Sequence, residues 1–200
     1  MIKAVIFDWG GVLIENPAPG MVSYMSSSLG VPGEALVTVC NQLIPGFQKG
    51  MISEDHLWES VCGALHVKKP CTSSLWGEAF RRVYDPRKEM FFLVSTLRDH
   101  GYKVGMLSNT EVPAMQYFHE EHGHVFDTAV FSCAEGTMKP ERRIYEIVLE
   151  RLQVHPQQAI FIDDREDFIA GAKELRINTI LFMSVRQVKK ELEYFIPRVF

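Results

Sequence analysis

The spacing of apolar residues changes twice along this chain. Residues 3–8 (KAVIFD) form a short apolar run that ends in an acid, and its Val and Ile predict a buried strand. From about Met21 to Tyr84, apolar residues recur at three- and four-residue intervals, which predicts consecutive amphipathic helices. Ser53, which precedes two acids and then Leu57, is typical of a helix start. We therefore predict one strand followed directly by a helical insert.

The pattern of apolar residues changes after Asp85-Pro86, where predicted helices and strands alternate. Helices are expected over residues 88–99, 113–121, 141–152, 168–175 and 185–195, and strands over residues 103–107, 128–131, 159–163 and 179–182. Strands that alternate with helices through short links indicate a parallel sheet with helices on both faces. An insert placed directly after the first strand lies over the carboxyl ends of the strands, where open α/β sheets bind their ligands.

Polar residues follow three of the predicted strands. The first strand ends at Asp8, the second is followed by Ser108-Asn109-Thr110, and the fourth ends at Asp163-Asp164. Because the carboxyl ends of parallel strands share one edge of a sheet, these side chains should converge. Lys139 precedes the helix expected near Glu141 and can reach the same place.

These residue types suit phosphoryl transfer. Clustered carboxylates repel one another, and a divalent cation removes that difficulty. Asp8 and Asp163 offer the hard oxygen ligands that Mg²⁺ prefers, and Mg²⁺ commonly binds substrate phosphate beside one or two carboxylates. Ser108 and Asn109 offer uncharged hydrogen-bond donors, and Lys139 offers a point charge. Positioning and charge stabilisation are what phosphoryl transfer requires, and a carboxylate nucleophile splits one difficult step into two easier ones.

Four segments in this order, FDWGGVL, LSNT, MKP and FIDD, resemble the four motifs of the haloacid dehalogenase superfamily. The chain is most similar to the phosphatases of that superfamily with a small helical cap, in the group that resembles bacterial α-glucose-1-phosphate phosphatase and the amino-terminal domain of soluble epoxide hydrolase. The resemblance covers residues 1–12 and 87–182, and the cap only loosely, through GFQKGMISEDHLW. It implies a Rossmann-like, parallel five-stranded α/β core over residues 1–14 and 86–200, with an all-helical cap over residues 15–85.

The resemblance also implies a metal site. Asp8 matches the nucleophile, which is at the same time a Mg²⁺ ligand. Gly10 matches the position whose backbone carbonyl binds Mg²⁺, and Asp163 matches the aspartate that completes the protein ligands. Asp164 is expected to act on the metal through water.

The implied phosphate site adds the remaining motif residues. Ser108 and Asn109 match the pair that binds phosphate, and Lys139 matches the catalytic lysine that steadies both the phosphate and the nucleophile. Within the cap, Phe47 and Lys49 are candidates for contacts with the substrate, because a cap must offer something to the pocket beneath it.

Gly10 departs from the family pattern. Most phosphatases of the family have an aspartate there, which protonates the leaving group, and such help is typically worth about a hundred- to ten-thousand-fold in rate. Glycine has no proton to give, which leaves three interpretations. The substrate has a good leaving group, such as an anomeric or acyl phosphate; another group or water supplies the proton; or the domain chiefly binds its ligand.

The predicted function is Mg²⁺-dependent hydrolysis of a small phosphorylated metabolite, sugar-like in our first interpretation, through an aspartyl phosphate. One alternative is a 2-haloacid dehalogenase-type hydrolase, which uses the same aspartate without Mg²⁺ and usually has tyrosine two residues after it. Another is a non-catalytic protein that binds a phosphorylated ligand or a partner protein.

Composition narrows the range of partners. The 200 residues carry a formal net charge of −4, and the basic residues are scattered, which is not typical of a nucleic-acid binder. The start MIKAVIFDWG lacks the apolar stretch of a signal peptide, and no apolar run approaches the ~20 residues that span a bilayer. The four cysteines form no C-x-x-C pair, so we expect free thiols in the cytoplasm. The pattern leaves the oligomeric state open.

A histidine-rich segment, FHEEHGHVF, holds His119, His122 and His124. It raises the possibility of a zinc site, but no acids or cysteines are placed to complete one. We interpret the segment as an exposed helix end.

Overall fold

A parallel sheet forms the centre of the larger part of the molecule. The computed structural model describes residues 1–122, 125–197 and 199, and in this part of the chain five strands pair in the order β3-β2-β1-β4-β5. These strands are β1 (Ala4–Phe7), β2 (Lys103–Ser108), β3 (Thr128–Phe131), β4 (Ala159–Asp163) and β5 (Asn178–Leu181). Each pairing is parallel. The predicted α/β fold with a parallel sheet is confirmed.

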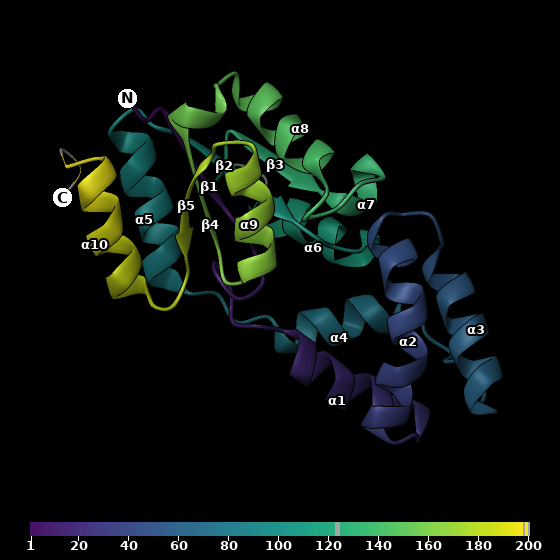
Figure 1. Ribbon diagram of the computed structural model, residues 1–200. Coiled ribbons are helices and arrows are strands. Elements are labelled where there is room, and N and C mark those ends of the chain that lie inside the picture. Colours follow the sequence, from purple (N-terminus) through teal and green to yellow (C-terminus); the bar gives the residue numbers. More distant parts are fainter. Residues whose placement is uncertain (123–124, 198, 200) are drawn as a thin grey trace.

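Helices cover both faces of the sheet (Figure 1). Side chains alternate along β1, so Val5 and Phe7 enter one core cluster while Ala4 and Ile6 enter the other. Helices α5 (Lys88–Asp99) and α10 (Val185–Phe195) pack into the first cluster, and α8 (Arg142–Leu152) and α9 (Glu166–Glu174) pack into the second. Because β1 is buried on both sides, its sequence is a continuous apolar run instead of an alternating one.

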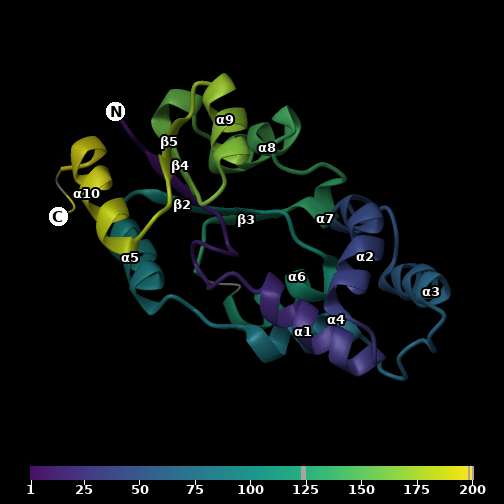
Figure 2. The same cartoon turned by 60° about the horizontal axis from the view of Figure 1, so that its bottom comes forward.

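Four helices stand beside the sheet as a separate group, which we call the helical unit (Figures 1 and 2). They are α1 (Ala18–Leu29), α2 (Gly33–Gln48), α3 (Glu54–Leu65) and α4 (Leu75–Val83). All four fall within residues 15–85, and the division of the chain into core and cap at those boundaries stays a prediction. The predicted helix start at Ser53 is confirmed, because its hydroxyl oxygen accepts a hydrogen bond from the backbone N–H of His56 at 3.2 Å.

Two adjacent backbone connections join the helical unit to the sheet. The N–H of Glu15 donates to the carbonyl of Asp85, and the N–H of Arg87 donates to the carbonyl of Leu13, each at 2.9 Å. The guanidinium of Arg87 reinforces this tie, because its Nη1 pairs with the carboxylate of Glu15 at 2.5 Å. The chain therefore enters and leaves the helical unit at one place.

The helices of the described chain differ from the predicted ones in two places. A short helix, α7 (Ser132–Glu135), follows β3 where we predicted neither a helix nor a strand. Helix α9 begins at Glu166 instead of Phe168, so Asp167 lies inside its first turn, where its carboxylate accepts hydrogen bonds from the side chain of Arg165. None of the described helices is both long and apolar enough to cross a membrane.

The histidine-rich segment is only partly as predicted. Helix α6 (Val112–His122) does end there, and His119 is exposed. His122, however, is half-buried, and its ring stacks on Phe91 with a centroid distance of 5.0 Å. Burial lowers the pKa of His122, and the apolar contacts show that it packs as an aromatic ring. His124 lies outside the described residues.

Candidate active site

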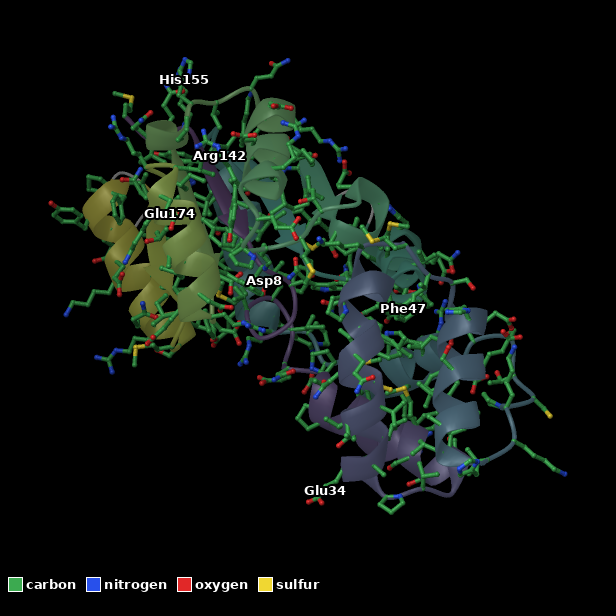
Figure 3. The ribbon with its side chains drawn as sticks, turned by 45° about the vertical axis from the view of Figure 1, so that its right-hand side comes forward. Asp8, Glu34, Phe47, Arg142, His155 and Glu174 are labelled. Atoms are coloured by element: carbon green, nitrogen blue, oxygen red, sulfur yellow. The ribbon has the colours of Figure 1, made fainter. Side chains whose placement is uncertain are left out.

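The ends of three neighbouring strands bring the predicted acids together. Asp8 follows β1, Ser108 ends β2 and Asp163 ends β4, and β1 lies between β2 and β4 in the sheet. Figure 3 shows Asp8 at the end of the sheet that faces the helical unit. Asp8 and Asp163 are both buried. A charge that is buried in this way needs a partner of opposite sign.

Lys139 is that partner for both acids. Its Nζ lies 2.8 Å from Oδ1 of Asp8 and 2.6 Å from Oδ2 of Asp163, and its side chain is only 1% exposed. The same Nζ lies 4.8 Å above the centre of the Phe168 ring. Burial on its own would lower the pKa of Lys139, but Asp8 and Asp163 together raise it above its ordinary value. The lysine is therefore held as an ammonium ion between two carboxylates.

The two oxygens of Asp8 have different surroundings. Oδ1 accepts a hydrogen bond from the backbone N–H of Trp9 at 2.7 Å in addition to its contact with Lys139. Oδ2 accepts no hydrogen bond from the described residues. Burial raises the pKa of Asp8 to about 7; Lys139 opposes the rise and Asp163 adds to it. The ammonium of Lys139 thus compensates only part of the cost of a charged Asp8.

Three carboxylates at this place fit a divalent cation. Oxygens of Asp8, Asp163 and Asp164 all lie within 4.8 Å of one another, and no other group of three potential metal ligands occurs in the described part of the chain. Three carboxylates against one ammonium leave an excess of negative charge. Oxygen ligands and that excess of negative charge suit Mg²⁺. The predicted contribution of the Gly10 carbonyl stays a prediction.

Gly11 makes room for this carboxylate group. Its φ of 91° lies in the region that favours glycine, and a Cβ at this position would collide with the carboxylate of Asp164. Gly10 is different, because a Cβ there would meet only the ring of Pro17, at 3.4 Å and beyond. Packing around its Cβ position therefore does not require glycine at residue 10.

The loop after β2 holds the phosphate-binding candidates. The hydroxyls of Ser108 and Thr110 lie 2.6 Å apart, and the N–H of Thr110 donates to Oγ of Ser132 at 2.8 Å. The side chain of Asn109 is engaged with Lys139: its Nδ2 donates to the backbone carbonyl of Lys139 at 2.9 Å, and its Oδ1 accepts from the backbone N–H at 2.8 Å. Asn109 therefore positions the lysine, and its phosphate contact, like that of Ser108, stays a prediction.

Glu111 is a site residue that our sequence interpretation missed. It is buried, and its carboxylate accepts a hydrogen bond from Nε2 of Gln48 at 2.8 Å and another from Nε1 of Trp76 at 3.0 Å. Gln48 belongs to α2 and Trp76 to α4, whereas Glu111 belongs to the part of the chain around the sheet, which we call the sheet domain. One acid of the sheet domain therefore holds two helices of the helical unit. Burial raises the pKa of Glu111. In the sequence its only signal is its position directly after LSNT.

A cavity of about 670 Å³ lies between the strand ends and the helical unit. Asp8, Ser108, Asn109 and Lys139 line one side, and residues of α1, α2 and α4 line the other. A cavity of this volume suits a small organic molecule.

The two cap candidates lie elsewhere. Neither Phe47 nor Lys49 lines the cavity. Phe47 packs its ring on that of Trp76 with a centroid distance of 5.1 Å, and Lys49 pairs with Glu141 at 2.5 Å. The prediction that they contact the substrate is therefore not supported, and both instead hold parts of the protein together.

Comparisons with known proteins agree with this geometry. A family model of haloacid dehalogenase-like hydrolases matches residues 2–176. The chain is 30% identical over 204 residues to acyl-CoA dehydrogenase family member 10 of Mus musculus, a match that covers 96% of this chain and 19% of that protein. It is 28% identical over 178 residues to a sesquiterpene phosphatase of Aspergillus oryzae, and this match covers 86% of this chain and 85% of that one.

The fold is also found among solved structures. A haloacid dehalogenase family enzyme of Bacteroides thetaiotaomicron, in complex with magnesium and inorganic phosphate, aligns with a TM-score of 0.74. The two are 24% identical, and the alignment covers 90% of this chain and 93% of that one.

Proposed function

The chain belongs to the haloacid dehalogenase-like hydrolases, and we propose that within this family it is a Mg²⁺-dependent phosphatase of a small phosphate ester. The observation that carries the proposal is the buried Lys139, whose Nζ contacts Asp8 and Asp163 at 2.8 and 2.6 Å. A relative named as a phosphatase, which aligns over most of both chains, supports the reaction type. A fold neighbour that holds magnesium and phosphate supports the cofactor.

In the first step Asp8 attacks phosphorus. Lys139 and the N–H of Trp9 hold Oδ1, so Oδ2 is the oxygen that is free to form the new bond. Lys139 and the hydroxyl of Ser108 stabilise the phosphoryl oxygens. Asp8, Asp163 and the Gly10 carbonyl would hold Mg²⁺, with Asp164 acting through water, and the bound ion would supply positive charge that offsets the charge of the phosphoryl group. The bond from phosphorus to the leaving oxygen breaks, and that oxygen keeps the electron pair.

In the second step a water molecule attacks the phosphorus of the aspartyl phosphate. The bond between phosphorus and Oδ2 breaks, the carboxylate of Asp8 is restored, and the proton of the water leaves with the phosphate. Because Gly10 provides no acid, the leaving oxygen departs as a stable anion or takes its proton from water. The aspartyl phosphate divides the reaction into two easier displacements.

We also propose that the substrate is a small phosphorylated molecule, that the reaction passes through an aspartyl phosphate, and that the protein is cytoplasmic. A 2-haloacid dehalogenase-type reaction is not favoured, because Gly10 stands where those enzymes usually have tyrosine. A non-catalytic role is less economical, because Asp8, Lys139 and Asp163 are all present and in contact.

The test is phosphate release from a panel of phosphate esters in the presence of Mg²⁺. The native protein is compared with Asp8→Asn, which keeps the shape of the side chain but removes the nucleophile. Glu166→Gln, an exposed acid at the start of α9, serves as the control. We expect release by the native and control proteins and none by Asp8→Asn. Equal release by Asp8→Asn would refute the nucleophile.

A further inference from the structure

The two sides of the active-site cavity differ in polarity. Every charged residue that lines the cavity comes from the sheet domain, and none of the lining residues within 15–85 carries a charge. The helical side of the cavity is therefore lined by apolar side chains and a few uncharged polar ones. Since phosphate must occupy the charged end near Asp8 and Lys139, the rest of the substrate extends towards the uncharged end.

Helix α2 presents an apolar stripe to the cavity. Leu36, Cys40 and Ile44 lie four residues apart, on one face of the helix, and all three line the cavity. Val37 also lines it and is 36% exposed, so an apolar side chain stands at its open rim. A group that enters here contacts hydrocarbon along the helix.

Helices α1 and α4 continue the apolar wall. Met21 and Met25, one turn apart on α1, line the cavity together with Phe80 of α4. The ring of Phe80 lies 5.0 Å from that of Trp9, the residue next to the nucleophile. The apolar surface is thus continuous from the helical unit to the edge of the reacting centre.

Two of the three polar side chains on this wall hydrogen-bond elsewhere in the protein, and the third, Asn41, is exposed. Three uncharged polar residues of the helical segment line the cavity: Asn16, Asn41 and Gln48. Gln48 donates its amide hydrogen to Glu111, and Oδ1 of Asn16 accepts from the N–H of Ala18. A sugar has a hydroxyl on nearly every carbon, and most of these hydroxyls would find no hydrogen-bond partner on this wall. Buried hydroxyls without a partner oppose binding.

We propose that the organic part of the substrate is apolar, so that the enzyme hydrolyses a phosphate ester of a hydrocarbon chain or ring instead of a sugar phosphate. This inference rests on the proposed phosphatase function and revises its sugar-like first interpretation. The charged end recognises the phosphate. The stripes on α1 and α2 recognise the hydrocarbon, and the rim at Val37 lets a long chain pass out of the cavity.

Because Gly10 supplies no acid, the rate depends on how readily the leaving oxygen departs, so the test esters must have leaving groups of equal acidity. Phenyl phosphate, 4-butylphenyl phosphate and 4-octylphenyl phosphate share a leaving oxygen of nearly constant acidity, so they differ mainly in apolar surface. All are used with Mg²⁺, below the concentrations at which they form micelles. We expect kcat/KM to rise along the series, by up to about fourfold for each methylene that becomes fully buried. Glucose 1-phosphate, the sugar arm, should be the poorer substrate.

Variants of α2 locate the effect in the cavity. Val37→Asn and Ile44→Asn place an amide on the apolar wall, and Thr38→Asn places the same amide on the exposed side of the same helix. We expect the ratio of kcat/KM for the octylphenyl and phenyl esters to fall severalfold for the first two variants and to stay unchanged for Thr38→Asn. Thermal melting confirms that each variant is folded.

The outcomes separate this inference from the function on which it rests. A flat chain-length series, a preference for glucose 1-phosphate, or an equal effect of Thr38→Asn overturns the apolar substrate and leaves the phosphatase intact. Release of phosphate by Asp8→Asn, or no release from any ester by the native protein, overturns the phosphatase and the apolar substrate with it.

Discussion

The strand ends and the helical unit face each other across one cavity, yet their side chains differ sharply in polarity. Neighbouring strands of one sheet position three carboxylates at their ends, and Lys139, from the segment between α7 and α8, adds a buried ammonium. The helical unit contributes apolar side chains on helices that are joined to the sheet by a few polar contacts. The difference suggests a division of labour, with chemistry on the sheet side and choice of substrate on the helical side.

The largest expected effect comes from breaking the charge balance on the sheet side. Lys139→Met leaves Asp8 and Asp163 buried without their ammonium. We expect activity to fall by about a thousandfold or more and the free energy of unfolding to drop by about 3–5 kcal/mol, as when one partner of a buried ion pair is removed. Phosphate release and urea unfolding measure the two effects.

A matched lysine controls for the loss of packing. Lys103→Met alters a half-buried lysine of β2 that donates to the carbonyl of Leu152 at 2.7 Å, away from the site. It should retain activity. Equal losses in both variants would mean that Lys139 acts only as part of the fold.

The next expected effect restores a group to the sheet side. Gly10→Asp supplies the acid that most phosphatases of the family have, and the space near Pro17 accepts a Cβ at this residue. We expect kcat/KM for an alkyl phosphate to rise by about a hundredfold, the lower end of what acid catalysis gives. The rate with 4-nitrophenyl phosphate should change little, because nitrophenolate leaves without a proton. A uniform change for both esters would contradict the proposed shortage of an acid.

A third prediction separates stability from activity on the sheet side. Folding raises the pKa of Asp8 from 3.8 to about 7, so between these pH values the folded protein keeps a proton that the unfolded chain releases. Stability therefore falls as pH rises through this window. Asp8→Asn should abolish activity in the presence of Mg²⁺, yet in metal-free buffer it should increase the free energy of unfolding by about 1–3 kcal/mol at pH 8. Urea unfolding from pH 4 to 8 tests this, and a gain that is independent of pH would contradict it.

The smallest expected effect concerns the contacts between the two regions. A double-mutant cycle with Glu111→Gln and Trp76→Phe removes the hydrogen bond between the carboxylate and the indole. We expect a coupling free energy of about 1–2 kcal/mol, because the acceptor is buried. The exposed pair Arg81–Glu120, which joins α4 to α6, should give less than about 0.5 kcal/mol in the same kind of cycle. Comparable values would show that burial of Glu111 adds nothing.

Most residues on the sheet side of the site could be predicted from the sequence. An apolar run that ends in an acid was enough to predict that Asp8 and Asp163 stand at strand ends, because parallel strands share an edge. The clamp of Asn109 on the backbone of Lys139 depends on the path of a loop, which spacing does not specify. Glu111 was missed because an acid at the start of a helix ordinarily faces solvent, and here two helices cover it.

The helical side was harder to predict. Periodicity shows that α2 has an apolar face, but it does not tell whether that face meets the protein core or a ligand. We selected Phe47 and Lys49 as substrate contacts only because a cap must offer something to the pocket beneath it, whereas the stripe of Leu36, Cys40 and Ile44 lines the cavity. His122 was misjudged for a related reason, because its aromatic neighbours come from segments distant in sequence.

The paired connections at Leu13–Glu15 and Asp85–Arg87 make the helical unit exchangeable as one piece. Its two ends leave the sheet domain side by side, joined by backbone hydrogen bonds of 2.9 Å. One insertion or exchange of DNA at this junction can therefore replace the whole unit without moving a strand or the carboxylates of Asp8 and Asp163. Selection can then alter what the enzyme accepts as a single heritable step, while the reaction that it performs is inherited unchanged.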